Sequence, residues 1–145
     1  MTASAILEGH GVAAGCVNAG GDLRLFGSTE QEVGLRNPGL PTQILSLGRY
    51  RNRAVATTGG YFLDSRLDVA SAVIDPASGL AVALPGSITV TAPRCMHADA
   101  LTKIAALRRS DDGCSESLFQ ELQATVHLFP IIDGEAEHDD PASRQ

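Results

Sequence analysis

The sequence feature that most constrains the fold is a pair of adjacent glycines, Gly20 and Gly21, set between two apolar runs. Residues 13–18 before the pair and residues 23–26 after it have the composition of short strands. Glycine adopts the positive φ angles of a two-residue hairpin turn at little steric cost. The segment therefore predicts an antiparallel hairpin, with the acidic residue Asp22 directly behind its turn.

Short apolar runs with strand character recur along the chain, and helical patterns lie near both ends. The predicted strands are residues 44–47, 54–57, 70–74, 87–92 and 125–132, and the predicted helices are residues 3–8, 98–109 and a segment capped by Ser115. The polar stretch that contains Pro38 and Pro41 is expected to be a surface loop. This mixture predicts an α+β fold, an antiparallel-rich sheet with helices on one face.

Length and composition restrict the classes of protein that need to be considered. A chain of 145 residues with 43% hydrophobic residues has room for one folded domain, which we expect over residues 1–134, followed by an acidic polar tail over 135–145. The net charge of -6 argues against nucleic-acid binding. The sequence has neither an apolar run long enough for a membrane span nor the features of a signal peptide, so the chain as given is expected to be cytoplasmic. Its three cysteines lack paired spacing and are expected to be buried free thiols.

Three further segments carry residues suited to a phosphate-bearing ligand. Residues 55–61 (VATTGGY) and 73–79 (VIDPASG) contain glycine turns, which expose backbone N–H groups. The third segment, ADALTK, opens a predicted helix and places Asp99 and Thr102 one helical turn apart. A carboxylate and a hydroxyl at that spacing can share a hard divalent cation. Glycine turns, a helix start and oxygen ligands together indicate a site for a phosphate-bearing cofactor.

The blocks NAGGD, AVATTGG, IDPASG and ADALTK follow one another between Val17 and Leu107. Their order and spacing resemble the second half of the FAD:protein FMN transferases, the ApbE family. This resemblance implies magnesium-dependent transfer of FMN from FAD to a threonine or serine of an acceptor flavoprotein. It therefore implies Mg²⁺ as cofactor, with FAD and the acceptor flavoprotein as partners.

The resemblance also implies roles for individual residues. Asp99 is expected to coordinate the magnesium ion, with the hydroxyl of Thr102 as a second ligand. The residues expected to bind the flavin cofactor come from the first three blocks and are Gly20, Gly21, Asp22, Thr57, Thr58 and Asp75. No residue is assigned a catalytic role.

Three positions depart from the family pattern. Thr58 stands where the family usually has serine, which preserves a hydroxyl. Lys103 stands where the family has a threonine four residues after the aspartate, so it can pair with Asp99 or face a phosphate, while Thr102 supplies the hydroxyl. Ala72 replaces a histidine associated with FAD binding, and alanine can neither donate a hydrogen bond nor exchange a proton.

Family members are about twice this length, so the chain resembles their C-terminal portion. A separate N-terminal half or a second copy of the chain is therefore an expected partner, because exposed edges favour association. Full-length relatives are often periplasmic or membrane-anchored. The alternative hypothesis is a catalytically inactive remnant that binds flavin weakly or acts as a protein-interaction module.

Overall fold

The structure, a computed structural model, describes residues 2–59, 73–84, 86–107 and 113–131. The described helices are α1 (Ala3–Gly9), α2 (Cys95–Leu107) and α3 (Gly113–Glu121). The described strands are β1 (Ala14–Ala19), β2 (Asp22–Gly27), β3 (Gln31–Arg36), β4 (Ile44–Tyr50), β5 (Ala54–Gly59), β6 (Gly86–Ala92) and β7 (Thr125–Pro130).

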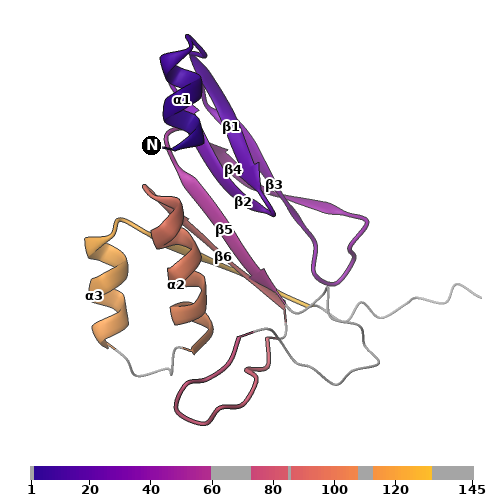
Figure 1. Ribbon diagram of the computed structural model, residues 1–145. Coiled ribbons are helices and arrows are strands. Elements are labelled where there is room, and N and C mark those ends of the chain that lie inside the picture. Colours follow the sequence, from indigo (N-terminus) through magenta and orange to yellow (C-terminus); the bar gives the residue numbers. More distant parts are fainter. Residues whose placement is uncertain (1, 60–72, 85, 108–112, 132–145) are drawn as a thin grey trace, which may run out of the picture.

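Five of these strands form one sheet in the order β1-β2-β5-β6-β7, and every neighbouring pair in it is antiparallel. Strands β3 and β4 form a separate two-stranded sheet. Figure 1 shows the three helices along one face of the five-stranded sheet, with the β3–β4 hairpin behind it. The predicted α+β fold with an antiparallel sheet is confirmed.

The double-glycine turn joins β1 to β2 as predicted. Ala19 faces Asp22 in the register, so Gly20 and Gly21 are the two turn residues. Their φ angles are 66° and 107°, positive values that other residues adopt only with strain. The side-chain Oδ1 of Asn18 accepts a hydrogen bond from the Gly21 N–H at 2.9 Å, which fixes the turn further.

The main core lies between the five-stranded sheet and the helices α2 and α3. Its fully buried members are Ala54, Ala56, Val90 and Ala92 from the sheet and Ala98, Leu101 and Phe119 from the helices. The small sheet residues leave room for α2 to lie close against β5 and β6. On the other face, Leu25 and Val55 pack against Val33 of the β3–β4 hairpin. The face of β2 and β5 opposite Leu25 and Val55 is therefore the one that α2 covers, and it is called the helix face below.

Helix α2 begins at Cys95, three residues before the predicted start at Ala98. The N–H groups of His97 and Ala98 donate to the carbonyl of Arg94, so the first turn forms directly behind Pro93. As a consequence, Asp99 lies in the second turn and not at the helix start. The favourable interaction between a carboxylate and a helix N-terminus therefore does not apply to Asp99.

Other differences concern elements with weak sequence signals. Residues 31–36, which we expected to be loop, form β3, where Val33 and Leu35 are buried and the flanking charged residues, Glu32 and Arg36, are exposed. Within the predicted strand 70–74, Ile74 forms only an isolated bridge to Ala81, and residues 70–72 lie outside the described residues. Helix α3 begins at Gly113, before Ser115.

The cysteines and the helix lengths bear on two expectations drawn from composition. Cys95 is half-buried but Cys16 is exposed, so the prediction of buried thiols is wrong for Cys16. Among the helices of the described segments, none combines the length and the apolar character that a membrane span requires. The predicted tail, 135–145, lies outside the described residues.

Candidate functional site

Helix α2 presents one buried face and one half-exposed flank at the predicted site. Ala98, Leu101 and Thr102 are buried against the sheet. Asp99 and Lys103 lie on the adjoining flank, where the Lys103 ammonium forms an ion pair with Asp99 Oδ1 across one helical turn. Lys103 therefore takes the first of the two positions expected for it, beside Asp99.

The buried hydroxyl of Thr102 ties α2 to the sheet. Its Oγ1 donates to the backbone carbonyl of Asp99 at 2.7 Å, and it lies 2.8 Å from Oγ1 of Thr58 on β5. Because the single proton of Thr102 goes to the Asp99 carbonyl, Thr58 must donate in the second bond. Thr102 is fully buried, so its hydroxyl is enclosed by these two partners. This hydrogen bond thus joins the AVATTGG block, which contains Thr58, to the ADALTK block, which contains Thr102.

Asp22, the residue after the double-glycine turn, lies near the start of α2. Cys95 Sγ lies 3.7 Å from the carbonyl oxygen of Leu23, so the start of α2 lies against the start of β2. Asp99 follows Cys95 by one helical turn on the same flank. Burial raises the pKa of the Asp22 carboxyl above its usual range, the Asp99 carboxylate raises it further, and the Lys103 ammonium lowers it. Asp22 therefore lies on the helix face of the sheet, within electrostatic range of the Asp99–Lys103 ion pair.

The group of Asp22, Thr58, Asp99, Thr102 and Lys103 is called the α2 site below. From the sequence, Asp22 is expected among the flavin-binding residues and Asp99 at the metal, and the two carboxylates are not paired. The signal for the pairing lies in the alternation of β2, because residues 22, 24 and 26 share one face of the strand. That face is recognisable only once α2 is known to cover it.

Other predicted site residues lie elsewhere or are engaged in their own turns. Thr57 faces away from Thr58, as neighbours in a strand do, and its Oγ1 lies 2.8 Å from Oγ1 of Thr89. Gly20 and Gly21 are exposed, and an added Cβ at either would have no neighbour within 4 Å. The Gly21 N–H already has Asn18 as its acceptor. A direct bond from that N–H to a phosphate would therefore compete with the turn.

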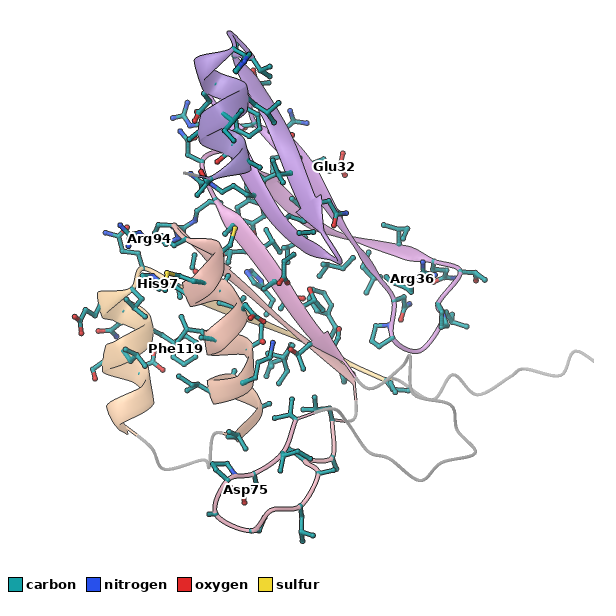
Figure 2. The ribbon with its side chains drawn as sticks, viewed as in Figure 1. Glu32, Arg36, Asp75, Arg94, His97 and Phe119 are labelled. Carbon is teal, nitrogen blue, oxygen red and sulfur yellow. The ribbon has the colours of Figure 1, made fainter. Side chains whose placement is uncertain are left out.

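Asp75 is held by the turn that contains it. Its Oδ1 accepts from the Ala77 N–H and its Oδ2 from the Ser78 hydroxyl, both at 2.9 Å. Figure 2 shows Asp75 in the loop beyond the C-terminal end of α2, whereas Arg94 and His97 lie at the opposite end of that helix. The flavin-binding role of Asp75 stays a prediction. Ala72, where the family histidine would stand, lies outside the described residues.

A cavity opens beside the α2 site, between α1 and the start of α2. Its volume is about 660 Å³, and its lining includes Glu8, Val17, Arg24, Arg94 and Met96. Arg24 follows Asp22 on the same face of β2, and its Nη1 donates to the Pro93 carbonyl at 3.1 Å. Sequence analysis did not select Arg24 or Arg94. Their positive charges beside an open cavity are suited to an anionic ligand.

Two carboxylates of the α2 site, those of Asp22 and Asp99, are suited to a divalent cation. Mg²⁺ in proteins commonly takes one or two carboxylates and fills its remaining positions with water and substrate phosphates. Asp22 and Asp99 meet that requirement as a pair, although no group of three or more His, Cys, Asp or Glu side chains converges within the part of the chain that the structure describes. The enclosed hydroxyl of Thr102 is better suited to fixing the helix than to facing an ion.

Three comparisons place this arrangement among known proteins. The model of the ApbE family matches residues 2–125. The flavin transferase ApbE from Vibrio cholerae has 23% identity and a TM-score of 0.64, covering 90% of this chain and 43% of that one. The apo form of the flavinyl transferase ApbE from Pseudomonas stutzeri has 19% identity and a TM-score of 0.60, covering 85% of this chain and 40% of its own. A search of curated proteins gave no match.

A third solved structure, the ApbE protein from Thermotoga maritima, has 26% identity and a TM-score of 0.57, covering 78% of this chain and 38% of that one. The chain therefore spans less than half the length of these three proteins. The family match extends over most of the chain, including β1–β6, both longer helices and all the described residues of the α2 site. The chain belongs to the ApbE family.

Proposed function

We propose that this chain carries part of the site of a flavin transferase that moves FMN from FAD to a threonine or serine hydroxyl of an acceptor flavoprotein, with Mg²⁺ as cofactor. The observation that carries the proposal is the contact between the starts of β2 and α2, which brings Asp22 within electrostatic range of Asp99 beside the Thr58–Thr102 link. Because the chain spans less than half of the related transferases, a second chain or segment is expected to complete the flavin site.

In this proposal, Asp99 and Asp22 hold the cation through their carboxylate oxygens. When bound, a divalent cation neutralises negative charge on the pyrophosphate of FAD. Thr102 and Thr58 act as positioning residues, since their bond fixes the second turn of α2 against β5. The two arginines, Arg24 and Arg94, bind phosphate oxygens at the cavity beside the acid pair.

The reaction is a substitution at the phosphorus atom of the FMN portion of FAD. The acceptor hydroxyl oxygen forms a new bond to that phosphorus atom, the bond from phosphorus to the bridging oxygen breaks, and AMP leaves with that oxygen. The hydroxyl proton passes to solvent or to a base that the proposal does not assign. The residues of this chain contribute by holding the pyrophosphate in one orientation during the exchange.

The test is to incubate the chain with FAD, Mg²⁺ and a candidate acceptor flavoprotein, and to follow AMP by chromatography and covalent flavin by in-gel fluorescence. Release of AMP together with labelled acceptor supports the proposal. Asp99→Asn is expected to abolish both signals, while Glu121→Gln on α3 serves as the matched control with an exposed carboxylate. FAD binding without transfer, in the chain alone and with its completing partner, would favour the inactive remnant.

A further inference from the structure

The charges at the α2 site do not balance by themselves. Asp22 and Asp99 bring two carboxylates, and Lys103 brings one ammonium, so one net negative charge remains. The ammonium forms an ion pair with Asp99 Oδ1, and its charge lowers the pKa of the Asp22 carboxyl. Lys103 therefore holds the Asp99 carboxylate at the place where a bound cation would contact it.

A divalent ion and the Lys103 ammonium cannot both bind Asp99 in this arrangement without repelling each other. The side chains of Lys103 and Asp99 are 45% and 51% exposed, so the lysine can rotate into solvent without disturbing the core. Thr102 beside it is fully buried and its hydroxyl makes two hydrogen bonds, so the helix backbone stays in place when the lysine moves. A metal ion can therefore replace Lys103 at Asp99 while the backbone of α2 stays in place.

We propose that Lys103 is the resident counter-ion of the Asp22–Asp99 pair, which a divalent cation must displace in order to bind. Lys103 thereby lowers the affinity of the site for divalent cations and sets the concentration at which the site fills. This inference rests on the proposed function for the identity of the site, but it concerns cation binding alone and can be measured without flavin.

The experiment measures Mn²⁺ binding to flavin-free protein by the loss of the free-ion signal in electron paramagnetic resonance. Lys103→Gln removes the charge and is expected to tighten Mn²⁺ binding by about three- to tenfold, the range for removing a half-exposed charge near a divalent ion. Lys103→Arg keeps the charge and is the matched control, with an affinity close to that of the wild type. Asp99→Asn in the Lys103→Gln background should remove the gain. Circular dichroism checks that each variant folds.

Equal Mn²⁺ affinity for wild type and Lys103→Gln, or no Mn²⁺ binding by any variant, would overturn the inference. The same is true if Lys103→Arg tightens binding as much as Lys103→Gln does, since charge would then not be the cause. The proposed function fails separately. If FAD does not bind to the completed protein although Lys103→Gln tightens Mn²⁺ binding, the transferase assignment is wrong and the role of Lys103 stands.

Discussion

The hydroxyl pair Thr58–Thr102 should be worth a measurable part of the stability of the fold. Thr102→Val keeps the side-chain volume but removes the oxygen that accepts from Thr58 and donates to the Asp99 carbonyl. A buried polar group that loses its partner costs about 1–3 kcal/mol. Since Thr58 is only partly buried and water can reach it in part, we expect the lower half of this range, about 1–2 kcal/mol.

Substitution of the partner residue, Thr58→Val, should lower the free energy of unfolding by less. Thr102 keeps its bond to the Asp99 carbonyl, so only one hydrogen bond is lost, at about 0.5–1.5 kcal/mol. In the double variant neither partner of the shared hydrogen bond is left. Its loss in free energy of unfolding should therefore be smaller than the sum of the two single losses by about 0.5–1.5 kcal/mol. This shortfall is the energy of the link between β5 and α2.

The assay is urea unfolding of the wild type, both single variants and the double variant, followed by circular dichroism. Thr125→Val on β7 is the matched control, because Thr125 is exposed and valine is favoured in strands. Strictly additive effects of the two substitutions would refute the reasoning, since the two hydroxyls would then not depend on each other. A cost of Thr102→Val no larger than that of Thr125→Val would refute it too.

Three further predictions concern the sheet. Burial lowers the pKa of His127, whose buried Nε2 has no hydrogen-bond partner among the residues that the structure describes. The unfolded chain therefore takes up a proton first as pH falls below about 6.5, so stability should drop there and level off once the folded protein is protonated. His127→Gln should remove part of the difference in Tm between pH 7.5 and pH 5 (about 1–3 °C), and an unchanged difference would contradict this. Gly20→Ala should cost about 1–2 kcal/mol in urea unfolding, because φ is 66° although space is open, and a neutral result would exclude backbone strain. Gly86→Ala should cost more than Gly20→Ala, since its Cβ would lie 2.1 Å from the Phe129 carbonyl oxygen; the reverse order would contradict the packing of β6 on β7.

The sequence predicted the parts of the fold that local chemistry determines. The β1–β2 hairpin follows from two glycines between apolar runs, and β6 and β7 follow from their apolar composition. Strand β3 was missed because its two buried residues, Val33 and Leu35, stand among charged and polar neighbours near two prolines. Val33 packs against Leu25 and Val55 of the five-stranded sheet, and the short alternation in β3 does not by itself indicate that contact.

The candidate site was predictable block by block, but not in its geometry. The resemblance selected Asp22, Thr58, Asp99 and Thr102, which the structure does bring together. The bond between Thr58 and Thr102 depends on how α2 crosses β5, which a pattern along the chain cannot specify. The same holds for Thr57, which looked equivalent to Thr58 in sequence and faces the other side of the sheet. Asp75 was selected by its motif, yet its carboxylate oxygens both accept bonds from its own turn.

In the proposed function, the two carboxylates of the α2 site serve a cation-dependent flavin dinucleotide site. Isothermal titration of FAD into the chain, supplied with its completing partner if one is found, tests it with Mg²⁺ present and with Mg²⁺ removed by chelation. We expect FAD binding that needs Mg²⁺ and that Asp99→Asn abolishes, while Glu121→Gln leaves it unchanged. Binding of equal strength without Mg²⁺, or in Asp99→Asn, would contradict it.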